Sequence, residues 1–198
     1  MMDYEELLNA PSVSEVDLDF TARALGEPPG PFTPRSTMLH LLGRGNPERY
    51  LSVVKRFLEY RQDPWLARVA LEVITIDWKM TNDFLPTLYE FARGVPWDED
   101  GDVQTVALSA AGEYLRGNSD PILLGILIHV FESTDELTSA EAYSGLARAL
   151  GRSWPSTTAL GWTYDRDGDP DVVIHARDRL QRELSEHAMM HSSDDTGQ

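Results

Sequence analysis

The 198-residue sequence contains no cysteine. Disulfides, thiolate metal sites and cysteine nucleophiles are therefore excluded. Long apolar runs are also absent: the longest, from Pro121 to Phe131, has eleven residues, whereas a membrane-spanning helix needs about 20. The opening Met-Met-Asp-Tyr-Glu-Glu has no basic region followed by an apolar one, so it does not resemble a secretory signal. We expect a soluble cytoplasmic protein with no membrane span.

Basic residues are scarce and unevenly placed. The chain has 17 lysines and arginines against 33 acids, which gives a net charge of −16. Residues 1–30 carry seven acids and one base, whereas residues 31–62 carry two acids and six bases. The bases of this basic island are Arg35, Arg44, Arg49, Lys55, Arg56 and Arg61. A mostly acidic protein repels phosphates and attracts basic proteins, so the charge predicts a basic protein partner and disfavours nucleic acid.

Familiar catalytic motifs are missing as well. The sequence has no glycine-rich phosphate loop, no nucleophile elbow and no His-Glu-x-x-His. This favours a non-enzymatic role, and no cofactor or metal is predicted. Four alternating aspartates around Gly168 (Asp165, Asp167, Asp169 and Asp171) suggest a calcium loop, but an EF-hand loop needs glycine at position 6 and glutamate at position 12. Here the glycine is at position 4, and position 12 is Ala176 instead of glutamate. We therefore interpret the stretch as the start of a helix.

What the sequence does contain is a repeat. Alanines recur at 70, 107, 142 and 176, separated by 37, 35 and 34 residues. The stretches that hold them are 63–74, 100–111, 135–146 and 169–180. Each opens with aspartate, which suits a helix N-cap, and two continue with proline, which suits the first helical position. Apolar residues then follow at helical spacing, so each copy predicts one amphipathic helix.

Further helices are predicted between and before these copies, near 12–25, 35–43, 47–61, 84–92, 120–131 and 155–162. The proline-rich stretch 27–34 cannot be helical, so we predict an acidic N-terminal segment with a proline-rich linker (1–34), which either packs as a cap or hangs free. A helical array at 35–187 and a disordered tail at 188–198 follow. In the last copy His175, Arg179 and Glu183 replace apolar residues, which predicts a terminal helix whose outer face meets water.

The pattern Asp-Pro-x-[Leu/Val]-x-x-x-Ala, at about 35 residues per two-helix unit, resembles HEAT-like or armadillo-like repeats. The resemblance covers 35–187, and the copy at 135 departs from it with Thr138. It implies an all-α, right-handed α-solenoid of about four helical hairpins with terminal capping helices. Members of this superfamily mostly bind other macromolecules, which implies a protein-interaction role.

Aromatic side chains beside acidic helix starts are the predicted docking site for the basic partner. The candidate protein-binding residues are Trp65, Trp97, Asp98, Glu99, Asp100, Asp102, Tyr164, Asp165, Asp167 and Asp171. The hypothesis is a monomeric, acidic binding module that neutralises a basic protein, as an immunity-protein-like inhibitor does. Two alternatives stay open: an enzyme like the HEAT-like DNA glycosylases, with the basic island contacting phosphates, and a general scaffold or adaptor.

Overall fold

The computed structural model describes residues 3–28, 33–133, 136–152 and 170–194. Every regular element in those ranges is a helix, and they contain no strand, so the all-α prediction is confirmed. The chain forms two compact units. The first unit comprises Met1–Leu85 and Pro96–Val106, and the second comprises Pro86–Val95 and Ala107–Gln198. None of the described helices combines the length and the apolar character needed to cross a membrane.

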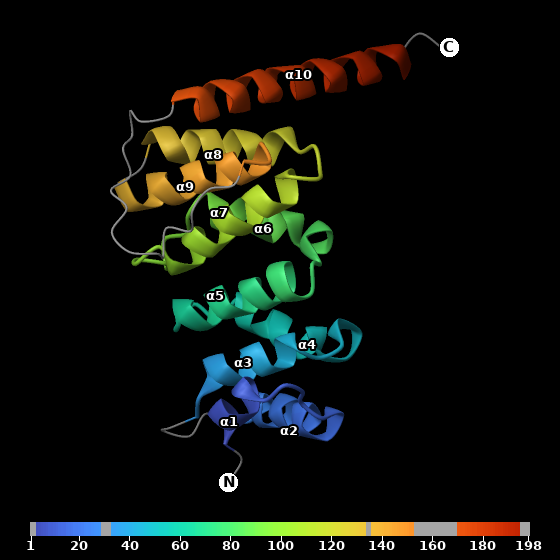
Figure 1. Cartoon of the computed structure of the whole chain (residues 1–198), viewed down its shortest axis with the longest axis vertical. Coiled ribbons are helices and arrows are strands. Elements are labelled where there is room, and N and C mark those ends of the chain that lie inside the picture. The colour runs from blue at the N-terminus through green and yellow to red at the C-terminus, as the bar shows by residue number, and fades with distance from the viewer. Residues whose placement is uncertain (1–2, 29–32, 134–135, 153–169, 195–198) are drawn as a thin grey trace. The chain divides into compact units, whose positions relative to one another are not determined.

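The first unit is built around one short, buried helix. Its α-helices are α1 (Tyr4–Asn9), α2 (Glu15–Gly26), α3 (Arg35–Gly43), α4 (Pro47–Leu58) and α5 (Pro64–Glu72), followed by a π-helix (Val73–Asp77) and a 3-10 turn (Thr81–Phe84). Helix α3 contacts α1, α2, α4 and α5 (Figure 1). Four of its nine residues, Met38, Leu39, Leu41 and Leu42, are completely buried. Apolar burial of this kind is the main source of stability for so short a helix.

The acidic N-terminal segment packs against α3 and α4. Arg44 donates hydrogen bonds to the carbonyls of Leu7, Leu8 and Ala10, at 3.3, 3.0 and 2.8 Å, and so satisfies the C-terminal end of α1. Helix α2 also buries Leu18 and Leu25 in the unit. Of the two arrangements left open by the sequence, the structure has the packed one. It also contains α1, which the sequence did not lead us to predict.

Helix α5 ends in an unusual way. It continues into the π-helix, in which the Trp78 amide donates to the Val73 carbonyl at 2.9 Å. Lys79 then adopts φ of 56°, the left-handed conformation that normally favours glycine, and the Met80 amide bonds back to the Ile74 carbonyl at 3.0 Å. The left-handed residue therefore closes the helix, with its positive charge at the negative end of the helix dipole.

The second unit contains most of α7 and all of the later helices. Its helices are α6 (Leu85–Ala92), α7 (Asp102–Leu115), α8 (Pro121–Ser133), α9 (Glu136–Ala149) and α10 (Pro170–Asp194). Helix α8 packs along α9, and α10 contacts both (Figure 1). Glycines let α7 and α9 approach closely, because a Cβ added to Gly112 would lie 2.5 Å from the carbonyl oxygen of Gly145.

All four repeat copies contribute a helix, and the shared alanines have the same environment. Helices α5, α7, α9 and α10 begin one or two residues after the repeat aspartates, and each shared alanine is 0% exposed within its own unit. Asp63 occupies the N-cap position of α5, but its side chain makes no capping bond. Two further capping aspartates were predicted, Asp135 for α9 and Asp169 for α10. Both lie outside the described residues, as does the helix predicted at 155–162.

At α7 the capping prediction was wrong about the residue. The carboxylate of Asp98, not that of Asp100, accepts from the first turn of the helix, with its Oδ2 2.9 Å from the Gln104 amide. Asp98 is only 8% exposed. The loop from 98 to 102 folds back so that an earlier aspartate reaches the helix, and Gly101, at φ of 72°, provides the left-handed turn that this requires.

The predicted water-facing stripe on the last helix was also partly wrong. His175 is exposed, but Glu183 is only 7% exposed and pairs with Arg179 at 2.7 Å. Arg179 also donates to the carbonyls of Ala149 and Asn118, at 2.6 and 2.7 Å. Arg179 therefore binds backbone carbonyls of neighbouring segments in the second unit, and Glu183 pairs with Arg179 instead of facing solvent. Helix α10 also runs to Asp194, so it includes part of the segment predicted as a tail.

Candidate functional site

The predicted acidic docking residues of the first unit do not share one environment. Glu99 and Asp100 are exposed, whereas Trp97 and Asp102 are half-buried. Asp98 is buried and engaged with α7; its Oδ1 is also buried and has no hydrogen-bond partner among the described residues. A protein partner could therefore reach Glu99 and Asp100. It could not reach Asp98, whose role is to cap the helix.

The second half of the predicted docking edge is largely outside the described residues. Tyr164, Asp165 and Asp167 fall in that part of the chain. Asp171 is described, and it lies exposed in the first turn of α10, in the second unit. The structure therefore brings together only the stretch from 97 to 102, which is contiguous in sequence.

Most of the basic island is engaged by the protein's own groups. Arg49 pairs with Glu15, at 3.1 Å, and with Asp19. Arg44 holds the end of α1, as described above, and the ammonium group of Lys55 lies 5.7 Å from the ring centre of Phe84. The contacts of Arg44 and Arg49 hold the acidic N-terminal segment on α3 and α4. Glu15 and Asp19 offset the charge of Arg49 locally, whereas Arg44 and Lys55 have uncharged partners and stay exposed.

A hollow of about 420 Å³ lies between the first turns of α3 and α5, within the first unit. Its lining includes Pro34, Arg35, Ser36, Tyr60, Asp63 and Trp65, and we call it the Trp65 hollow. Trp65 is 46% exposed, which is unusual for so large an apolar side chain, and the Arg68 guanidinium stacks 4.3 Å from its ring centre. Of the predicted docking residues that the structure describes, Trp65 alone lines this hollow.

Arg35 is fixed in the wall of the Trp65 hollow by several contacts. Its guanidinium carbon lies 5.7 Å from the ring centre of Phe57 and 5.8 Å from that of Tyr60. One terminal nitrogen donates to the Glu27 carbonyl at 3.0 Å, and the other lies 3.4 Å from the Tyr60 hydroxyl. The Nε atom is buried with no partner among the described residues. The positive charge is thus held in one place by aromatic packing and hydrogen bonds.

The ends of two helices add to the polarity of the Trp65 hollow. Pro34 occupies the N-cap of α3 and Asp63 that of α5, and neither makes a side-chain capping bond. The amides of the first turn of each helix therefore lie at the positive end of a helix dipole without a side-chain partner, although the first residue of α5, Pro64, has no amide hydrogen. Asp63 supplies the one negative charge among the described residues of the lining.

Sequence reasoning found part of this hollow. Trp65 was predicted because an exposed tryptophan after Asp63-Pro64 precedes the buried stripe. The participation of Tyr60 was missed, and Arg35 was considered only as a phosphate contact. The sequence contained one usable signal: Tyr60, just after α4, is followed within five residues by the start of α5. That Tyr60 and the start of α5 meet the start of α3 depends on tertiary packing.

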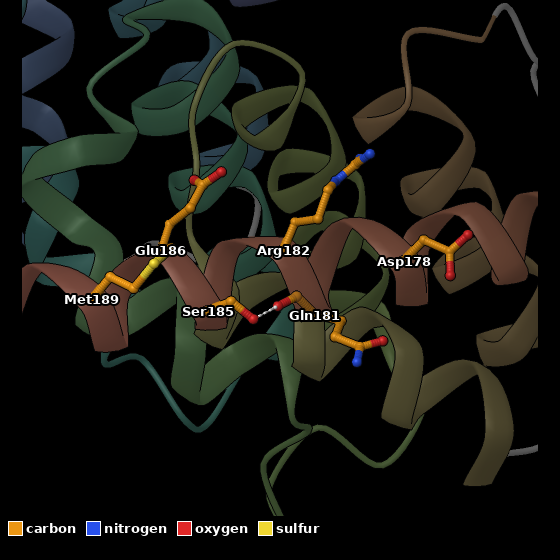
Figure 2. A pocket seen from close by; sticks show the side chains of 6 residues that line it. All are labelled: Asp178, Gln181, Arg182, Ser185, Glu186 and Met189. Carbon is orange, nitrogen blue, oxygen red and sulfur yellow. Dashed lines mark hydrogen bonds between the residues drawn. The ribbon is translucent and has the colours of Figure 1, made fainter.

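A second concave surface has all of its described lining residues on α10. Its described lining consists of Asp178, Gln181, Arg182, Ser185, Glu186 and Met189. Figure 2 shows Arg182 and Glu186 pointing to the same side of the helix, and Ser185 Oγ donating to the Gln181 carbonyl at 2.8 Å. Opposite charges one turn apart on an open helix face are typical of a solvated surface. This surface offers no enclosed group of ligand-binding atoms.

One titratable cluster lies where α5 passes into the π-helix. The pKa of Asp77 is raised mainly because neighbouring groups partly desolvate its carboxylate, although the residue as a whole is exposed; the Glu72 carboxylate raises the pKa further and His40 lowers it. The Asp77 carboxylate packs against Gly43, where an added Cβ would lie 2.4 Å from Oδ2. Within the described residues no group of three or more histidine, aspartate and glutamate side chains is arranged to hold a metal ion.

The comparisons with known proteins add no relative. No family model, curated protein or solved structure matches the chain.

Proposed function

We propose that the chain is a HEAT-like helical-repeat protein that acts as a non-enzymatic binding module for a basic protein. The observation that carries the proposal is the engagement of the basic island. Arg44, Arg49 and Lys55 are held by carbonyls, carboxylates and a ring of the first unit. Internal pairing does not change the net charge of −16, and the carboxylates of Glu15 and Asp19 offset the charge of Arg49 locally, so the basic island is set within an acidic surface.

The repeat features support the helical-repeat part of the proposal. The four shared alanines, spaced about one two-helix unit apart, are all fully buried, and helices α8 and α9 pack side by side as a hairpin. A right-handed solenoid is the arrangement that such repeats commonly build. Neutralisation of a basic partner, in the manner of an immunity protein, is the form of binding that the charge favours; a scaffold role would use the same surface.

The glycosylase-type alternative loses its main support in the same contacts. Such an enzyme needs a basic groove with a buried aspartate at its centre. Arg44 and Arg49 are exposed but bind carbonyls and carboxylates of the N-terminal segment, and Asp77, which has a raised pKa, is also exposed. Phosphate contacts would have to displace the segment first, at the expense of the hydrogen bonds that hold it.

Binding kinetics test the proposal. The protein is immobilised, partners are captured from the native host, and the retained protein is purified and its association rate measured at about 50 and 300 mM salt. We expect a basic partner whose association slows by about tenfold at the higher salt concentration, because electrostatic steering is screened. An acidic partner, or a rate that does not change with salt, would contradict the proposal.

A matched pair of variants locates the surface. Reversing Glu99 and Asp100 to lysine should slow association if the loop before α7 docks the partner. Reversing Asp178 and Glu186 on α10 changes the net charge by the same amount at a different surface. Equal slowing by both pairs would show that total charge, and not this loop, governs encounter.

A further inference from the structure

We propose that the Trp65 hollow binds a small carboxylate ligand with a flat, apolar body. Its volume of about 420 Å³ lies in the range of small-molecule sites. The site is distinct from the acidic surface proposed for the protein partner, and it depends on neither the repeat architecture nor the identity of that partner.

The preference for an anion comes from the charges around the hollow. The described lining holds one guanidinium, that of Arg35, and one carboxylate, that of Asp63, and a second guanidinium, that of Arg68, stacks on Trp65 beside the lining. The uncapped starts of α3 and α5 add two partial positive charges. The ring face of Trp65 near Arg68 is already covered by a cation, which leaves less of the indole for a cationic ligand.

The preference for a carboxylate over a phosphate also follows from Asp63. A phosphate carries nearly two charges at neutral pH, so the Asp63 carboxylate would repel it about twice as strongly as a singly charged carboxylate. A planar carboxylate also matches the flat guanidinium of Arg35, which aromatic packing holds in place before any ligand arrives.

The apolar body of the ligand is inferred from Trp65 and its neighbours. Trp65 is 46% exposed, and Pro34 and Leu66 complete the apolar part of the lining. A flat ring against the indole would bury this surface, which gains free energy beyond that of the ionic contact. The same exposed tryptophan could act as a protein contact, so the test uses ligands too small to mimic a protein surface.

Three probes of similar shape but different charge test which ligand charge the hollow prefers: benzoate, neutral benzamide and cationic benzamidinium. Each is titrated into the full chain while the indole N–H resonance of Trp65 is followed by NMR; a Trp65→Phe variant assigns that signal among the five tryptophans. We expect a saturable shift with benzoate, binding of benzamide at least about threefold weaker, and no shift with benzamidinium. Tighter binding of benzamidinium than of benzoate, or no saturable shift with benzoate, overturns the proposal.

Two variants test the roles of the charges. Asp63→Asn should tighten benzoate binding by about threefold, because a repelling charge is removed while the side chain keeps its size. Arg35→Lys keeps the charge but loses the planar group, and should weaken binding by about fivefold. Because Arg35 also packs on Phe57 and Tyr60, the thermal midpoint of this variant is measured alongside. Weaker benzoate binding in Asp63→Asn would overturn the assignment even if Arg35→Lys does not fold.

Discussion

At the scale of single residues, the buried aspartate before α7 shows how a cap can lie outside the expected position. Asp98 Oδ2 accepts from the Gln104 amide, six residues later, and the left-handed Gly101 makes the turn between them. A cap on a long helix satisfies an amide that would otherwise stay unpaired in a partly buried place. The acidic character of the loop therefore has a structural part, Asp98, and an exposed part, Glu99 and Asp100.

This division gives a residue-level prediction. Asp98→Ala should lower the free energy of unfolding by about 1 kcal/mol, the usual contribution of a side-chain cap. Asp100→Ala is the matched control and should change it by less than about 0.5 kcal/mol, because the residue is exposed and does not cap the helix. Urea denaturation of both variants decides the matter: equal destabilisation, or a larger loss for Asp100→Ala, would show that the cap has been assigned to the wrong residue.

At the scale of elements, arginine side chains link α1 and α2 to the rest of the first unit. Arg44 donates three hydrogen bonds to the carbonyls at the end of α1. We predict that Arg44→Ala speeds amide hydrogen exchange in α1 at least about tenfold, since a hydrogen bond from a charged donor contributes about 1.5 kcal/mol or more. Arg56→Ala, an exposed arginine on α4, should leave this exchange unchanged. Faster exchange throughout the first unit in Arg44→Ala would instead mean that the segment does not open by itself.

The start of α8 predicts a pH effect. Asp120 accepts from the Leu123 amide at 2.9 Å and from the Tyr89 hydroxyl at 2.5 Å. Burial, together with Asp120, raises the pKa of Tyr89 to about 12 from an ordinary value near 10. The folded state therefore holds this proton more tightly than the unfolded chain, so the associated stability is complete below about pH 10 and is lost as the pH rises towards 12. Tyr89→Phe should flatten the decline in unfolding free energy over this window, as measured by urea denaturation at several pH values. A decline as steep as in the unaltered protein would assign it to other tyrosines.

Elements were the level at which the sequence was most informative. Periodic apolar residues placed α2 to α9 and the start of α10 to within a few residues, because burial of one helix face leaves a direct trace in composition, whereas the end of α10 was predicted too early. Helix α1 was not predicted, because a segment of six residues is too short to show a helical period. The Trp65 hollow could be predicted only through Trp65; the convergence of Arg35 and Tyr60 on it is set by how α3, α4 and α5 pack, which local patterns do not record.

At the scale of the whole molecule, the net charge of −16 sets a background of self-repulsion. Only a few ion pairs are found among the described residues, and most are substantially exposed. Screening these pairs with salt should therefore lower the free energy of unfolding only slightly. We therefore predict that the thermal midpoint rises by a few degrees between about 20 and 300 mM sodium chloride, as screening relieves the repulsion. Calorimetry checks this result. A falling midpoint would mean that attractive pairs, such as those of Arg49, outweigh the general repulsion.

The route of the chain through its two compact units affects how the protein can be made and divided. The chain passes from one unit to the other three times, after Leu85, Val95 and Val106, and the last crossing falls inside the continuous helix α7. A ribosome must therefore complete part of the second unit before it supplies the final segment of the first. A single genetic cut or protease nick cannot release either unit intact.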